Sequence, residues 1–183
     1  ALAQLGETWS SVDFFQEAYG GGDEDEVKDA GGGEGVVMLL RLGEEDFETL
    51  EADQLIVQGM LGSRFLSTFE EEVTTWAGSL RMISDVMALL VEIQRTWSYL
   101  EPLFIGSEEV KRELPADAKH FAKIDVEVKD ILKIAGKIGN VNEACNRDGL
   151  LARLEEQSSG LDSCKKNLAD FLDRSPPPSR PSP

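Results

Sequence analysis

The chain has 183 residues, of which 41% are hydrophobic and 29% charged, so it fits one globular domain or two small ones rather than a disordered chain. Its 35 acidic and 18 basic residues leave a net charge of −17. Nucleic acid is excluded as a partner because a phosphate backbone must be met by clustered cations, and an anionic membrane is disfavoured for the same reason.

Cysteine usage and the apolar pattern give the first expectation about location. Cys145 and Cys164 are the only cysteines, and their spacing is that of neither a zinc site nor a disulfide framework. A reducing compartment, the cytoplasm, fits best. No secretory leader and no apolar stretch long enough to span a membrane is evident. Because the first residue is Ala1 rather than methionine, we expect an excerpt or a processed product.

The N-terminal part predicts a helix followed by a β-hairpin. Leu2, Leu5 and Trp9 have helical spacing, and the short apolar run from Val36 to Leu40 reads as a strand. Its partner is expected in residues 12–18. Between them, residues 20–35 combine glycine triplets with four consecutive acids, which predicts a flexible acidic loop.

Helical periodicity begins at residue 44. A loose apolar stripe over Phe47, Leu50, Leu55, Val57 and Met60 predicts a helix that ends at residues 62–63. From residue 64 to residue 104, steps of four and three alternate along a narrow, mostly apolar seam, which predicts a long helix packed lengthwise on others. The members of this seam are Phe69, Val73, Trp76, Leu80, Ile83, Met87, Leu90, Gln94, Trp97, Glu101 and Phe104.

Two further long helices complete the expected fold. Pro102 should bend or end the seam helix near residues 101–106. A stripe from Phe121 to Ile138 predicts a helix over 115–138, and a loop through Cys145 then leads to a last helix from Leu150 onwards. We therefore predict a mainly α fold: an elongated bundle of long helices with one small β-hairpin near the N-terminus. It forms one domain over 1–173, and residues 174–183 form a Pro-rich disordered tail.

The residue patterns of catalytic and metal sites are missing from the sequence. Gly136-Lys137 has neither the earlier glycine nor the hydroxyl of a phosphate-binding loop, and His120 is the only histidine that could serve as a general base. The acid runs 23–26 and 70–72 lack calcium-loop spacing. We therefore expect no enzymatic activity, no catalytic residues, no cofactor and no metal.

The seam carries a specific resemblance. The string Gln94-Arg-Thr-Trp97-Ser-Tyr99-Leu100-Glu101, with Ser63-Arg-Phe before it and Phe121-Ala-Lys-Ile-Asp125 after it, resembles the N-terminal linker region of dynein heavy chains over roughly residues 5–173. The segment Phe104-Ile-Gly-Ser-Glu108 is similar to axonemal outer-arm chains in particular. The sequence departs from the family pattern at Arg174, where prolines begin, so we expect a truncated fragment or a different exon.

The resemblance implies a mechanical role. In this family the linker is a mostly helical arm that lies across a ring of AAA+ modules and passes the ring's conformational change to the tail. The implied partners are the AAA+ ring and tail of the same heavy chain and other dynein subunits. The implied location is the cytoplasm and cytoskeleton, in the axoneme of a cilium or flagellum. Nucleotide and microtubule sites lie downstream in the family.

Two interpretations of the seam stay open. Aromatic residues at helical spacing are usually core residues, but some of them can face a partner. Because Gln94 and Glu101 interrupt the apolar seam, the candidate interface is Gln94, Trp97, Tyr99 and Glu101.

The alternative to a dynein linker is a generic spectrin-like helical scaffold or adaptor that binds partner helices. The linker interpretation predicts the hairpin of residues 12–18 and 36–42, whereas a simple three-helix scaffold predicts none.

Overall fold

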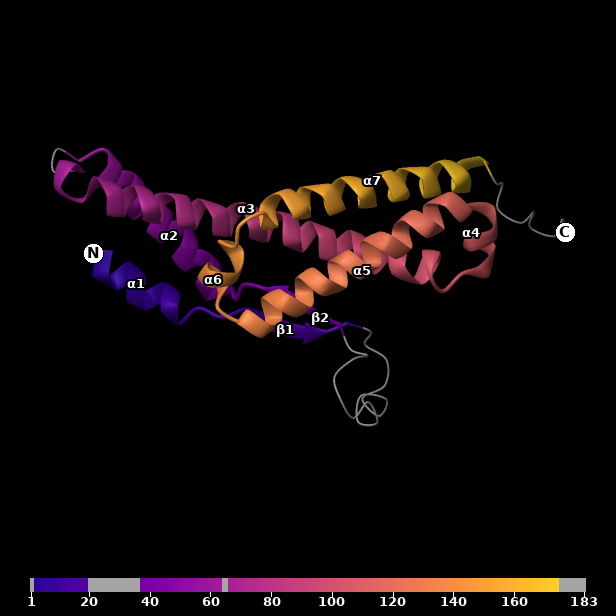
Figure 1. Ribbon diagram of the computed structural model, residues 1–183, viewed down its shortest axis with the longest axis horizontal. Helices are drawn as coiled ribbons and strands as arrows, with labels where there is room; N and C mark the ends of the chain where they lie inside the picture. The colour runs from indigo at the N-terminus through magenta and orange to yellow at the C-terminus, as the bar shows by residue number, and fades with distance from the viewer. Residues whose placement is uncertain (1, 20–36, 64–65, 175–183) are drawn as a thin grey trace, which may run out of the picture.

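Helices dominate the computed structural model, which describes residues 2–19, 37–63 and 66–174 (Figure 1). The prediction of a mainly α bundle with one small N-terminal hairpin is confirmed. The predicted loop 20–35 and tail 174–183 lie outside the described residues, except for Arg174, which ends the last helix. In chain order the elements are α1 (Leu2–Ser10), β1 (Phe15–Ala18), β2 (Met38–Arg41), α2 (Glu44–Leu61), α3 (Leu66–Phe104), α4 (Glu108–Glu113), α5 (Pro115–Ile138), α6 (Val141–Cys145) and α7 (Leu150–Arg174).

The long helix α3 forms the axis of the molecule (Figure 1). From Val73 to Phe104 every seam position is buried or half-buried, as the alternating spacing predicts. Ile93 and Leu100, which lie off the seam, are also buried, because α3 contacts several neighbours. Pro102 is accommodated in the last turn, and the helix ends two residues later.

The seam prediction is wrong at its first position. Phe69 is 53% exposed, and its backbone leaves helical values there, with φ −126° and ψ 17°. The first turn of α3 is therefore set off by a kink from the straight part that begins at Glu70.

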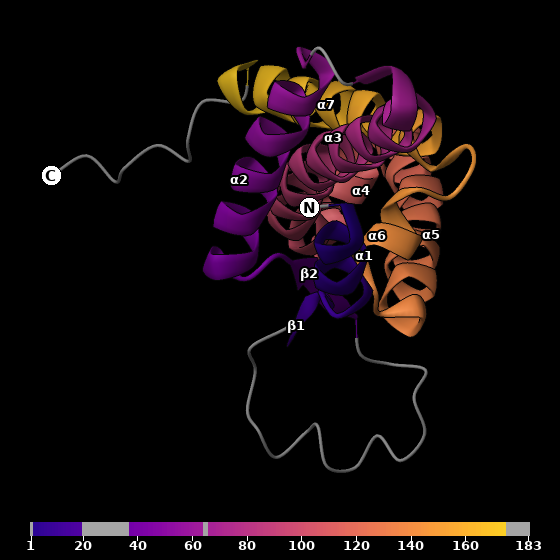
Figure 2. The same ribbon diagram turned by 90° about the vertical axis from the view of Figure 1, so that its left-hand side faces the viewer.

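Three helices cover different sides of α3. Figure 2 shows α2 and α5 on opposite sides of α3, with α7 lying across the top, and α7 also packs on α5. Gly160 of α7 lies close against α5, since an added Cβ there would be 2.8 Å from Cδ1 of Ile124. In the same N-terminal half of α5, the rings of Phe104 and Phe121 stack with centroids 5.3 Å apart. The short helix α4, capped by the Ser107 hydroxyl, connects α3 to α5.

The hairpin packs against the bundle rather than standing alone. Its strands pair antiparallel with Gln16 opposite Leu40, and β2 lies against both α3 and α5. A lone two-stranded hairpin is marginal in water, so these helices supply its stability. The observed strands fall inside the predicted ranges 12–18 and 36–42.

Asn140 ties the N-terminal helix to the region between α5 and α7. Its side-chain amide donates to the carbonyl oxygen of Trp9 at 2.8 Å, and its amide oxygen accepts the backbone N–H of Glu143 at 2.9 Å. This second bond caps α6. The sequence predicts a loop through Cys145; the structure instead has this short capped helix, with Val141 and Cys145 buried.

The predicted apolar stripe of α2 is only half right. Leu50 and Val57 are buried, but Phe47 is 50% and Leu55 is 74% exposed. Because α2 has a neighbour, α3, along only one side, the remaining apolar residues stay on its surface. Within the described part of the chain, no helix has the length and apolar character needed to cross a membrane.

Candidate functional site

The four predicted interface residues lie on one stretch of α3, but they do not form one exposed surface. Gln94 is 6% exposed and Trp97 is fully buried, whereas Tyr99 is 53% exposed and Glu101 is half-buried. Only Tyr99 and Glu101 therefore reach the surface of this structure. Gln94 and Trp97 instead make interior contacts that hold this stretch of α3 against the hairpin and α5.

Gln94 completes the sheet by binding the backbone of β2. Its side-chain oxygen accepts the N–H of Leu40 at 2.6 Å, and its side-chain nitrogen donates to the carbonyl oxygen of Leu40 at 2.7 Å. The same nitrogen also donates to the carbonyl oxygen of Leu90 at 3.1 Å. The amide thus takes the place of a neighbouring strand at one residue of β2, and it satisfies both backbone groups of the buried Leu40. This explains why a polar residue interrupts the apolar seam.

Trp97 links α3 to α5 through a buried carboxylate. Its indole Nε1 donates to Oδ1 of Asp125 at 2.8 Å, and the other carboxylate oxygen of Asp125 lies 2.9 Å from Nζ of Lys129. Asp125 is only 6% exposed. A buried carboxylate requires such partners, since an unpaired one is strongly destabilising. The pair therefore fixes the position of α5 along α3.

Tyr19 connects the end of β1 to the same stretch. Its ring lies 4.6 Å from that of Trp97 between centroids, and its hydroxyl donates to Oε2 of Glu101 at 3.0 Å. Burial, and then the hydrogen bond to Glu101, raise the pKa of Tyr19 to about 12. The tyrosine therefore stays a neutral donor at physiological pH. Glu101 holds the hairpin from its half-buried position on α3.

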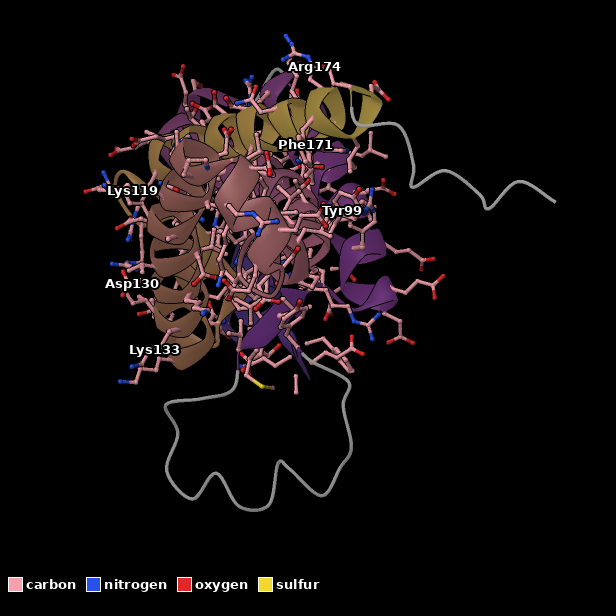
Figure 3. All side chains as sticks on the ribbon, turned by 90° about the vertical axis from the view of Figure 1, so that its right-hand side faces the viewer. Tyr99, Lys119, Asp130, Lys133, Phe171 and Arg174 are labelled. Carbon is pink, nitrogen blue, oxygen red and sulfur yellow. The ribbon has the colours of Figure 1, made fainter. Side chains whose placement is uncertain are left out.

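Tyr99 belongs to the opposite, outer face of α3. Val91, Arg95 and Tyr99 follow one another at intervals of four residues, so they lie along one side of the helix. Val91 is 41% exposed, and Arg95 is exposed as well. In Figure 3, Tyr99 lies on the surface away from α5. This outer face of α3, formed by Val91, Arg95 and Tyr99, is the exposed part of the predicted interface.

Of the histidine and the two cysteines singled out in the sequence, only His120 and Cys164 lie close to each other. His120 is exposed on α5, and its Nδ1 lies 3.8 Å from Sγ of Cys164 on α7. Burial raises the pKa of the Cys164 thiol to about 11, with the charge of Asp117 adding to the effect, so the thiol stays protonated at neutral pH. Among the described residues, no group of three or more His, Cys, Asp or Glu side chains could hold a metal ion.

Both thiols should be unreactive in the folded protein. Cys145 and Cys164 are buried, and burial raises the pKa of Cys145 to about 12. A disulfide reagent at pH 8 is expected to modify neither cysteine in the native chain and both in guanidinium chloride. The measurement is the absorbance of the released aromatic thiolate. Rapid reaction of either thiol without denaturant would contradict this burial.

Several residues of this region carry no signal in the sequence that identifies their partners. Buried tryptophan N–H groups usually find an acceptor, so a partner for Trp97 could be expected, but its identity, Asp125, could not. The same holds for Trp9, whose Nε1 donates to Asp53 at 3.0 Å. A carboxylate on the apolar face of a predicted helix indicates a buried acid that needs a partner, and Asp125, between Ile124 and Val128, is such a residue. The pattern does not indicate which residue that partner is.

Comparison with known proteins identifies the family. The family described as "Dynein heavy chain, N-terminal region 2" matches residues 1–175. The chain is 42% identical over 173 residues to the dynein alpha chain, flagellar outer arm, of Chlamydomonas reinhardtii. It is 38% identical over 172 residues both to the ciliary dynein beta chain of Tripneustes gratilla and to dynein axonemal heavy chain 17 of Mus musculus. Each alignment covers 94% of this chain and 4% of the relative.

The fold defines a helical rod braced by a small hairpin. The chain belongs to the dynein heavy-chain family, in its N-terminal region 2. This confirms the resemblance carried by the string from Gln94 to Glu101, including its similarity to flagellar outer-arm chains. The chain spans about 4% of the length of these relatives, so their complete activity does not transfer to it directly.

Proposed function

We propose that this chain is a non-catalytic, mechanical linker segment of a microtubule-based axonemal dynein heavy chain. It passes the conformational change of an AAA+ ring in the same heavy chain to the tail, while ATP is hydrolysed elsewhere in that chain. The observation that carries the proposal is the straight part of α3. From Glu70 to Phe104 it continues without a break in helical backbone geometry, over about 50 Å.

Stiffness of α3 comes from its surroundings. An isolated helix is only marginally stable in water, and in a folded protein most of a helix's stability comes from tertiary packing rather than from its own propensity. Here α2 covers one side, α5 and α7 cover others, and the hairpin is bonded to α3 through Gln94 and Glu101. A rod braced in this way can move as a unit when one end is displaced.

The outer face of α3 is the surface we propose for contact with the ring, the tail or other dynein subunits. Tyr99 is a large amphipathic side chain with more than half of its area exposed, the kind of residue that anchors interfaces. Gln94 and Trp97 support this face from the interior, and Glu101 joins it to the hairpin. The proposed location is the axoneme of a cilium or flagellum.

The hairpin favours the linker over the spectrin-like scaffold. A simple three-helix scaffold would have no strands, whereas here β1 and β2 pair and pack on two helices. The family match supports the same choice.

The test uses the complete axonemal heavy chain that carries this sequence. Tyr99→Asp is expected to leave basal ATP turnover unchanged and to reduce the velocity of microtubule gliding, because it disrupts a docking surface without touching the bundle core. Ser159→Asp, which also adds a charge at an exposed helical position, is the control and should have neither effect. Unchanged gliding in the Tyr99 variant would exclude this surface, and ATP turnover by the isolated 183-residue chain would overturn the non-catalytic assignment.

A further inference from the structure

A groove runs along the surface between α2 and the N-terminal half of α3, in the left-hand part of Figure 1. Its volume is about 610 Å³, and its floor consists of the apolar side chains of Val57 and Leu61 from α2 and of Ala77 and Leu80 from α3. At one end Gln54 joins the two helices, since its side-chain nitrogen donates to the carbonyl oxygen of Leu80 at 3.5 Å. We name this feature the α2–α3 groove.

The apolar surface of α2 continues beyond the α2–α3 groove. Phe47 precedes the groove residue Gln54 by two turns, so it lies on the same side of α2, and its side chain is 50% exposed. Figure 2 shows α2 at the edge of the bundle, with α3 as its neighbour on one side. From Phe47 to Leu61 this side of α2 is about 21 Å long, which matches about four turns of a helix laid against it.

The surroundings of the α2–α3 groove are acidic. Helix α2 carries six acidic residues and no basic one. Glu51 and Glu70 each precede a groove residue by one turn, and they lie at opposite ends of the groove. The one base in residues 66–85, Arg81, lines the groove and lies 3.9 Å from Asp85. Within the described residues, no ion pair involves Glu70 or an acid of α2.

We propose that the α2–α3 groove docks an amphipathic helix of a separate polypeptide, with an apolar stripe against the groove floor and lysine or arginine residues beside it. A helix that lays its apolar face in a groove is a recurring mode of recognition, and the acidic surroundings select a basic partner.

The charge also indicates that the partner is a separate molecule. A field of one sign accelerates the encounter of separate molecules, whereas a tethered segment gains little from it at its high effective concentration. A second copy of this chain is disfavoured, because each copy carries a net charge of −17. The groove shares no residue with the outer face of α3, so its test is independent of the test of the proposed function.

The probe is a fluorescein-labelled helical peptide of about 20 residues, with leucines along one stripe and lysines and arginines elsewhere. Fluorescence anisotropy at low ionic strength measures its binding to the 183-residue chain. A scrambled peptide of the same composition has no apolar stripe and controls for charge alone.

Gly78→Gln blocks the groove without a change in charge. Gly78 lines the groove, and an added Cβ would meet nothing within 4 Å, so the new side chain extends over the groove without a clash. Gly59→Gln is the matched control, because Gly59 is an exposed residue of α2 outside the groove at which an added Cβ also meets nothing within 4 Å. Glutamine is a better helix former than glycine, so both variants should fold, which circular dichroism verifies.

We expect Gly78→Gln to weaken binding about tenfold or more and Gly59→Gln to leave it within about twofold of the wild type. Glu51→Gln combined with Glu70→Gln should weaken binding about threefold, and Glu155→Gln combined with Glu156→Gln, at exposed positions of α7, should weaken it less. Unchanged affinity of the Gly78 variant, equal binding of the scrambled peptide, or no binding by the wild-type chain would overturn the proposal.

Two further measurements identify the occupant. The same peptide should bind the complete heavy chain that carries this sequence, with the same loss on Gly78→Gln. Absence of binding there, despite binding by the 183-residue chain, would show that another part of the heavy chain fills the groove. Self-association of the wild-type chain that Gly78→Gln abolishes would assign the groove to a second copy, and either result would overturn the proposal.

Discussion

Replacing Trp97 with alanine is expected to lower the free energy of unfolding by about 3–5 kcal/mol. The side chain is fully buried between α3, the hairpin and α5, so its removal leaves a large cavity. It also removes the indole donor from the buried carboxylate of Asp125. Urea denaturation followed by circular dichroism measures the change. An unaltered slope of the unfolding free energy against urea concentration would show that the folded state has lost stability without a change in the surface exposed on unfolding.

Two companion variants separate packing from hydrogen bonding at Trp97. Trp97→Phe retains most of the ring and loses the N–H, so we expect a smaller loss of about 1–3 kcal/mol. Tyr99→Ala changes a residue that is 53% exposed on the same helix and should stay within about 0.5 kcal/mol of the wild type. A Trp97→Ala chain as stable as the wild type would contradict burial and return Trp97 to the candidate interface.

Gln94→Leu is expected to cost about 2–4 kcal/mol, because it leaves the N–H and the carbonyl oxygen of Leu40 without partners in the interior. The specific readout is hydrogen exchange at the Leu40 amide, which should become much faster as β2 separates from α3. Gln58→Leu, at an exposed position of α2, is the matched control and should leave both stability and exchange unchanged. Unaltered protection of the Leu40 amide would show that Gln94 does not hold the strand.

Periodicity predicted the parts of the fold in which one face of an element is buried along its whole length. The seam from Val73 to Phe104 is buried apart from the half-buried Trp76 and Glu101, and the stripe from Phe121 to Ala135 is buried, because several elements pack on each of these helices. The stripe of α2 failed at Phe47 and Leu55, because apolar spacing alone does not reveal how many neighbours a helix has. The helix α6 was missed because its five residues are too few to show helical periodicity, although its cap is local: the side chain of Asn140 accepts the N–H of Glu143.

The sequence named Gln94, Trp97, Tyr99 and Glu101 as a candidate interface, but it did not indicate how deeply each side chain is buried. A polar residue in an apolar seam can contact either an external partner or a polar group in the interior. For Gln94 the partner is the backbone of β2, which is 54 residues away in the sequence, and no local pattern specifies that pairing. Trp97 is bonded in the same way to Asp125 across the interface with α5. The exposed residue Tyr99 is the part of the string that remains available to a partner.

Breaking the rigidity of α3 in the complete heavy chain tests the mechanical role most directly. A flexible Gly-Ser insertion after Val91 interrupts the rod at an exposed position, and the same insertion after Asp148, in the exposed turn between α6 and α7, leaves α3 intact. If the rod transmits movement, the first chain hydrolyses ATP but moves microtubules far more slowly, whereas the second moves them at the normal rate. Normal gliding by the chain with interrupted α3 would contradict transmission through this helix.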